Sequence, residues 1–188
     1  MKEFSVIVIG ASTGGLTPVR TIAEALPARC KAAIAVTIHV GPYPSVVPEI
    51  LNWHGKLPAA FGRDGELFNP GRIYVAPPDC HMLFQEPSII RLDRGAKVHA
   101  TRPAIDPMFA SAARLYGRRV VGVVLSGNGK DGAAGLRLIH SQGGLALAQD
   151  PTEAPARHMP AAAVATNNPQ LLPVAEIARR VAEFCAAR

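Results

Sequence analysis

The stretch FSVIVIGASTGG at residues 4–15 decides the fold. Its first half is a nearly continuous apolar run, which is typical of a strand buried on both faces of a parallel sheet. Its second half consists of small residues and leads into a helical pattern at 17–26, with Thr17 as one candidate cap and Pro18 at the first helical position. A helix start one turn earlier, near Gly14, is the alternative. A buried strand that turns at glycines into a helix indicates an α/β protein.

Strand-like and helix-like segments alternate along the rest of the chain. Further strands are predicted at 32–38, 57–61, 72–76, 119–126 and 145–149. Further helices are predicted at 44–54, 107–116, 131–141, 160–165 and 173–187. Residues 82–84 and 88–92 favour a hairpin, 93–104 a surface loop, and Asp106 the cap of the helix after that loop. We therefore predict a doubly wound, mostly parallel sheet with helices on both faces, Rossmann-like, plus a small β-hairpin.

Length and composition favour one domain over residues 1–188. The apolar fraction is 48%, and no stretch approaches the ~18 apolar residues that span a bilayer. The N-terminus has no secretory signal pattern, so a cytoplasmic protein without membrane insertion is expected. Cys30, Cys80 and Cys185 are odd in number and unrelated in spacing, which favours buried reduced thiols.

The net charge of +6 concerns partners and not the fold. No run of Lys or Arg is longer than a pair, and aromatic residues make up only 5% of the chain. Nucleic acid is therefore not the expected partner. An acidic protein surface fits this charge.

Three predicted strands end in residues with complementary chemistry. In an open parallel sheet, ligands bind beyond the carboxyl ends of the strands. The first buried strand delivers Ser12, the second His39, and the third is followed by a glycine-rich loop that ends at Asp131. A serine hydroxyl needs a base to take its proton, and a carboxylate orients that base, so the set predicts a nucleophile, a general base and an orienting carboxylate.

The loop around Ser12 has a second predicted role. Small neighbours allow a tight turn and a close approach of substrate. The helix that follows offers free N–H groups at its start. We therefore expect Thr13, Gly14 and Gly15, together with Asn128 on the third loop, to bind the oxyanion or the substrate.

The same glycine-rich turn also fits a dinucleotide-binding site. That reading expects an acidic residue about 20 residues later at the next strand end, where His39 stands instead. An inactive Rossmann-like module that binds a nucleotide or a protein remains the alternative. Cys80-His81 offers adjacent metal ligands without a second pair, so neither a metal nor a cofactor is expected.

These motifs resemble the catalytic domain of the chemotaxis protein-glutamate methylesterases. The resemblance runs through nearly the whole chain and is carried by VIGASTGG at 8–15, His39, GRIYVAPP at 71–78, RPAIDPMF at 102–109, LSGNGKDG at 125–132, AQD at 148–150 and MP at 159–160. It implies demethylation of glutamate methyl esters on methyl-accepting chemotaxis receptors or similar acidic helical proteins, with deamidation of glutamine as a further activity.

The chain departs from the family pattern beside the expected site. Asn128 stands where the family usually carries methionine, and Val-Gly-Pro-Tyr-Pro follows His39 where Met-Pro-Pro is usual. Family members usually join this domain to a receiver domain, which the present sequence lacks. We therefore expect an open site whose activity does not depend on phosphodonors.

Overall fold

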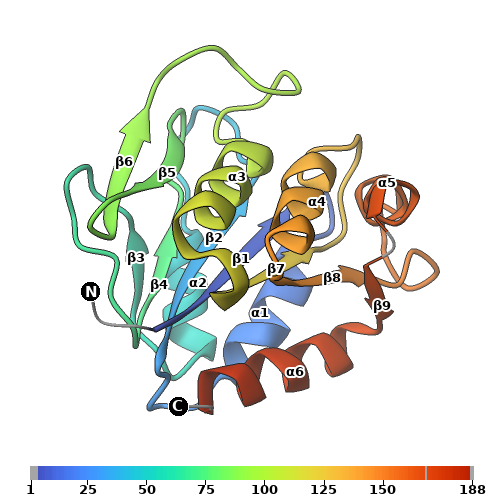
Figure 1. Cartoon of the computed structure of the whole chain (residues 1–188), viewed down its shortest axis with the longest axis horizontal. Coiled ribbons are helices and arrows are strands. Elements are labelled where there is room, and N and C mark those ends of the chain that lie inside the picture. Colours follow the sequence, from blue (N-terminus) through green and yellow to red (C-terminus); the bar gives the residue numbers. More distant parts are fainter. Residues whose placement is uncertain (1–3, 168, 187–188) are drawn as a thin grey trace.

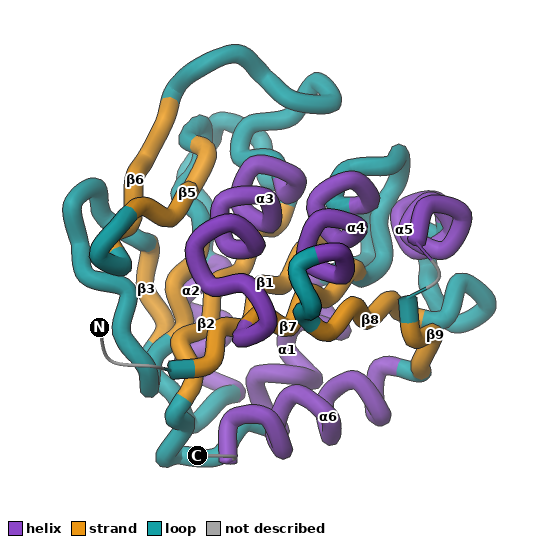
Figure 2. The backbone as a smooth tube through the Cα atoms, viewed as in Figure 1, coloured by secondary structure: helices purple, strands orange, loops and turns teal. Residues whose placement is uncertain are grey.

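The computed structural model describes residues 4–167 and 169–186, which form a central sheet between two layers of helices (Figures 1 and 2). The sheet has seven parallel strands in the order β3-β4-β2-β1-β7-β8-β9. Their bounds are Ser5–Ala11 (β1), Ala32–Ile38 (β2), Ala59–Phe61 (β3), Ile73–Val75 (β4), Val120–Val124 (β7), Leu145–Gln149 (β8) and Gln170–Leu172 (β9). A separate antiparallel hairpin consists of β5 (His81–Gln85) and β6 (Ile89–Asp93).

The helices cover both faces of the sheet, as Figure 1 shows. On one face lie α1 (Leu16–Ala25), α2 (Val47–His54) and α6 (Val174–Ala186), and on the other α3 (Ile105–Tyr116), α4 (Ala133–Ser141) and α5 (His158–Asn167). A short 3-10 turn, Gly117–Arg119, joins α3 to β7. Within the described residues, none of the helices has both the length and the apolar character that a membrane span needs.

The central strands are buried on both faces because helices lie above and below them. All seven residues of β2 are buried, as are all five of β7. Alternate side chains of one strand therefore enter two separate cores: Ile7 and Ile9 pack with α1 and α6, while Val6 and Val8 pack with α3. This is why the strands read as continuous apolar runs and not as alternating ones.

The order of the strands places a crevice at the middle of the sheet. In the sheet, β2, β4 and β3 lie in that order on one side of β1. The later strands β7, β8 and β9 lie in that order on the other side. The helices that follow β1 and β7 therefore lie on opposite faces of the sheet. Such a switch point is where open α/β sheets bind ligands.

The predicted fold class is confirmed, one strand was missed, and three local predictions need correction. The strand β9 was not predicted. Thr17 does not cap α1, because the helix already starts at Leu16 after Gly15. Asp106 is not a cap either: it lies inside the first turn of α3, and its carboxylate accepts the N–H of Gly135 at 2.7 Å. The helix at 160–165 begins earlier, at His158.

The prediction of three reduced thiols is wrong for two of the cysteines. Cys30 and Cys185 form a disulfide between the segment before β2 and the end of α6. Their Cα atoms lie 4.7 Å apart although 155 residues separate them, so only the packing of α6 brings them together. Cys80 is free and buried.

The α3–α4 contact generates a test of the packing. A methyl group at Gly135 would place its carbon 2.5 Å from Cβ of Phe109 and 3.2 Å from the carbonyl oxygen of Asp106. We expect Gly135→Ala to lower the free energy of unfolding by about 1–3 kcal/mol, although alanine is the better helix former. Urea unfolding measures this. Ala134→Ser at the exposed neighbouring position is the control, and a stabilised Gly135→Ala variant would contradict the packing described.

Candidate active site

The three residues predicted from the strand ends meet at the switch point. Ser12 directly follows β1, His39 directly follows β2, and Asp131 lies in the loop between β7 and α4. Because β1 and β2 pair in register from Ser5↔Ala32 to Ala11↔Ile38, Ser12 and His39 leave the sheet side by side. The main chain links them too, since the N–H of His39 donates to the carbonyl of Ala11 at 3.0 Å.

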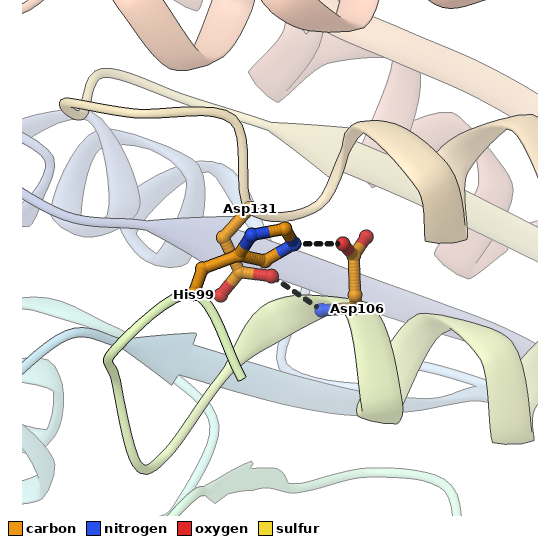
Figure 3. Close-up of side chains that lie close together, drawn as sticks. All are labelled: His99, Asp106 and Asp131. Carbon is orange, nitrogen blue, oxygen red and sulfur yellow. Dashed lines mark hydrogen bonds and ion pairs between the residues drawn. The ribbon is translucent and has the colours of Figure 1, made fainter. Parts of the chain in front are cut away.

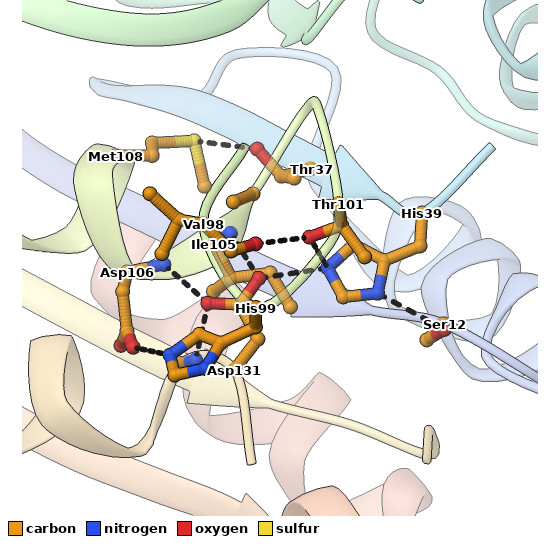
Figure 4. Close-up of polar contacts among 12 residues, drawn as sticks. Ser12, Thr37, His39, Val98, His99, Thr101, Ile105, Asp106, Met108 and Asp131 are labelled. Atoms are coloured by element: carbon orange, nitrogen blue, oxygen red, sulfur yellow. Dashed lines mark hydrogen bonds and ion pairs between the residues drawn. The ribbon is translucent and has the colours of Figure 1, made fainter. Parts of the chain in front are cut away.

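Hydrogen bonds join the three side chains in a row, with the imidazole in the middle (Figure 4). His39 Nδ1 lies 3.1 Å from Ser12 Oγ, and His39 Nε2 lies 2.8 Å from Asp131 Oδ2. A carboxylate only accepts, so Nε2 carries the proton and Nδ1 is the acceptor for the serine hydroxyl. The ring thus presents its basic nitrogen to Ser12. The His39 side chain is 12% exposed, and Ser12 is also partly buried.

Asp131 is the most firmly held member of the row. It is 2% exposed, and its two oxygens accept four hydrogen bonds. Oδ2 accepts from His39 and from the N–H of Ile105 at 2.7 Å, while Oδ1 accepts from the N–H groups of Asp106 and Gly132, both at 2.9 Å. Figure 3 shows the bond from Asp106. Burial by itself raises the pKa of this carboxyl, but the hydrogen bonds from His39, Ile105 and Asp106 outweigh it and hold the pKa below its usual value.

The backbone around Ser12 is fixed by the loop after β7. The N–H of Ser12 donates to the carbonyl of Ser126 at 2.9 Å. Gly127 lies directly against the nucleophile: a Cβ there would stand 2.7 Å from Cβ of Ser12 and 2.2 Å from the sulfur of Met159. Gly14 has φ +70°, which a glycine adopts without strain.

The four residues expected to bind the oxyanion or the substrate differ in the hydrogen bonds that they already make. The N–H of Gly15 donates to the carbonyl of Ser12 at 2.9 Å, so this donor is engaged in the turn. Within the described residues, no hydrogen bond engages the N–H groups of Thr13 and Gly14. Asn128 is exposed. Its side-chain nitrogen lies 3.4 Å from Thr13 Oγ1, and its side-chain oxygen lies 3.0 Å from His158 Nδ1.

Sequence reasoning missed several residues that surround the site. The segment 93–104 was expected to be only a surface loop, yet Thr101 Oγ1 lies 3.4 Å from His39 Nε2. His99, which no sequence feature supported, lies beside Asp106 and Asp131 (Figure 3). His158, which lies 3.0 Å from the side-chain oxygen of Asn128, was also not among the predicted site residues. The sequence feature that could have pointed to this part of the site is the RPAIDPMF motif at 102–109, which begins next to Thr101.

Two groups of residues have the composition of a metal site, and both are committed to hydrogen bonds. Ligand atoms of His99, Asp106 and Asp131 lie within 4.8 Å of one another. However, His99 Nε2 pairs with Asp106 at 2.8 Å, and a cation on Asp131 would compete with its four donors. His81, which together with Cys80 was not expected to bind a metal, uses one ring nitrogen toward the carbonyl of Ala96 and the other toward the N–H of Ala104.

A cavity of about 450 Å³ opens beside the nucleophile loop. It lies between the start of α1 and the segment after β8, and its walls include Gly14, Thr17, Gln149 and Pro155. Gln149 is buried and accepts the N–H of Ser126 at 2.8 Å, so this wall is tied to the loop that also holds Ser12.

Known proteins match this chain over most of its length. The family model of the CheB methylesterases matches residues 7–181. A protein-glutamate methylesterase/protein-glutamine glutaminase from Anaeromyxobacter dehalogenans is 38% identical over 95% of this chain and 53% of its own length. A protein of the same description from Pseudomonas aeruginosa is 37% identical over 97% of this chain and 54% of its own. The chain thus spans about half the length of these relatives. A Leptospira interrogans relative, 34% identical, is covered over 92% of its length.

A solved structure agrees with the fold over nearly all of both chains. The CheB methylesterase catalytic domain of Thermotoga maritima superposes with a TM-score of 0.92 at 30% identity, over 96% of this chain and 98% of that one. Family model, relatives and solved structure therefore lead to one conclusion. The chain belongs to the CheB methylesterase family.

Proposed function

We propose that this chain is a serine hydrolase that removes methyl groups from glutamate methyl esters of methyl-accepting chemotaxis receptors. The observation that carries the proposal is the hydrogen-bonded row Ser12–His39–Asp131 at the switch point of a CheB-family fold. In this proposal Ser12 is the nucleophile, His39 the general base and Asp131 the residue that orients His39. The names of the relatives from Anaeromyxobacter and Pseudomonas support the reaction.

The proposed mechanism uses the proton positions set by the hydrogen bonds. His39 takes the hydroxyl proton of Ser12 on Nδ1 as Oγ attacks the ester carbonyl, and Asp131 stabilises the imidazolium across Nε2. The tetrahedral intermediate collapses when His39 returns the proton to the methoxy group, and methanol leaves. Water then attacks the glutamyl ester of Ser12 by the same route, which releases the glutamate side chain and regenerates the enzyme. The sequence of steps requires no cofactor.

The negative oxygen of the intermediate needs donors near Ser12. The N–H groups of Thr13 and Gly14 are the proposed donors, because Gly15 is engaged and the start of α1 carries no side-chain cap. Asn128, which contacts Thr13, is the proposed side-chain contact to the substrate. Deamidation of glutamine follows the same path with ammonia as the leaving group, and the relatives' names include this activity.

Two measurements test the proposal against a catalytically inactive binding module. A fluorophosphonate probe should label Ser12 in the purified chain, since only an activated serine reacts with it. Methanol release from methylated receptor should then identify the substrate. A chain whose Ser12 resists the probe and which releases no methanol would be a binding module and not a hydrolase.

The roles of Ser12 and His39 predict losses that do not add. Ser12→Ala and His39→Ala should each lower kcat on a small methyl ester on the order of 10³-fold or more, and the double variant should be little worse, because the residues act as a unit. Ester hydrolysis under saturating substrate measures this. Independent, multiplying losses in the double variant would count against the assignment.

We expect replacement of Asp131 to change both the activity and the stability of the protein. Asp131→Asn should lower kcat by about 10³–10⁴-fold, since an amide cannot hold the protonated Nε2 tautomer in the same way. It should also lower the free energy of unfolding by about 1–3 kcal/mol at pH 7, because backbone donors lose their acceptor. The pKa of Asp131 is depressed in the folded protein. The extra stability of the wild type over Asp131→Asn is therefore fully present above the ordinary carboxyl pKa of about 4. It is lost as the pH falls through the lower pKa that Asp131 has in the folded state. A stability difference that grows on acidification would contradict this linkage.

Two observations support a proposal about the partner: the net positive charge of the chain, and the position of two positive side chains beside the proposed site. The sequence carries +6, and exposed Lys130 and Arg157 lie on the two loops that meet at the Asn128–His158 contact. We propose that these positive charges steer an acidic, helical receptor surface toward Ser12.

Steering predicts a difference between large and small substrates. Raising the salt concentration should lower kcat/KM on intact methylated receptor several-fold more than on an uncharged small methyl ester, because screening weakens long-range attraction. The variant with Lys130 and Arg157 changed to Ala should lose part of this salt dependence. Equal salt sensitivity on both substrates would refute steering.

A further inference from the structure

The loop between β6 and α3 ends in a tight turn that lies against the proposed base. Val98 and Thr101 pair through both main-chain groups, with N–H to carbonyl distances of 3.1 and 2.9 Å. The two residues between them, His99 and Ala100, have φ of +50° and +60°. Side chains other than glycine rarely adopt this left-handed backbone, and two in succession require contacts that hold them.

Those contacts come from both ends of the loop. At the tip, His99 Nε2 lies 2.8 Å from Asp106 Oδ2, and the other oxygen of Asp106 accepts the N–H of Gly135 on α4. At the base, the Arg102 guanidinium binds Asp79 at 2.7 Å. The loop is therefore fastened to the helices α3 and α4 at its tip and to the β4–β5 connection at its base.

The fastened turn delivers one hydroxyl to the imidazole. Thr101 Oγ1 donates to the carbonyl of Val98 at 2.9 Å, so its lone pairs face outward, and His39 Nε2 lies 3.4 Å away (Figure 4). The proton on Nε2 thus has a main acceptor in Asp131 and a second, weaker one in Thr101. Two acceptors on one side of a ring restrict its rotation about the Asp131 bond.

We infer that His99 is a positioning residue for His39: its pair with Asp106 holds the 98–101 turn so that Thr101 and Asp131 together fix the plane of the imidazole. This inference rests on the proposed function, because it assigns a role in the same reaction. Orientation of the base matters most when the proton moves, so the effect belongs in kcat and not in substrate binding.

Variants of His99 test the inference. We expect His99→Ala to lower kcat roughly tenfold on a small methyl ester, with KM within about twofold of wild type. His99→Gly removes the cost of the positive φ as well as the imidazole and should show the same loss, so backbone strain would not explain it. His99→Gln keeps a donor for Asp106 and should recover most of the rate. His54→Ala, which breaks an exposed pair with Glu24 at 3.2 Å, is the matched control and should leave kcat unchanged.

A double-mutant cycle tests whether His99 acts through Thr101. Thr101→Val should lower kcat by a similar factor, and Thr101→Ser should restore it. Adding His99→Ala to Thr101→Val should then cost little more, because the turn has lost the group it delivers. Full, multiplying losses, or a His99→Ala enzyme with wild-type kcat, would overturn the inference.

A second readout separates this inference from the proposed function. If fluorophosphonate does not label Ser12 in the wild-type chain, the proposed function fails. The far-downfield NMR resonance of the proton between His39 and Asp131 still reports on the geometry. We expect it to shift or broaden in His99→Ala and His99→Gly and to stay unchanged in His54→Ala. An unchanged resonance in folded His99 variants, with melting temperatures near wild type, would overturn the inference.

Discussion

The rest of the site depends on one buried carboxylate with four donors. Asp131 takes one hydrogen bond from the imidazole of His39, two from the start of α3 and one from Gly132 in its own loop. An ionised group can stay buried only where such donors replace water. The carboxylate therefore joins three chain segments that follow different strands, and it sets which nitrogen of His39 remains free to accept from Ser12.

The sheet makes this meeting of segments geometrically simple. Parallel strands bring their carboxyl ends to one edge, and the reversal of strand order between β1 and β7 leaves that edge open. Tight contacts then fix the fine positions: Gly127 lets the β7 loop lie against Ser12, and Gly135 lets α4 lie against α3. The loops of the site follow strands whose residues belong to the two cores.

Charge and fold have separate roles in this picture. The fold places a nucleophile, a base and a carboxylate in a row, and the proposed ester hydrolysis depends on that row. In the proposed function, the exposed positive residues lie outside that row and act on the approach of the partner. Substitutions in the two groups are therefore separable by experiment, since one changes proton transfer and the other changes encounter.

The sequence by itself determined the fold class and the row of Ser12, His39 and Asp131, because continuous apolar runs mark buried parallel strands and their ends converge on one edge. Only the tertiary structure decided what surrounds the row. The engagement of the Gly15 N–H, the role of Asp106 between two helices and the approach of Thr101 to His39 depend on loop conformations that have no periodicity to read. The Cys30–Cys185 pair is of the same kind, since spacing along the chain carries no information about partners 155 residues apart that meet only when α6 packs beside β2.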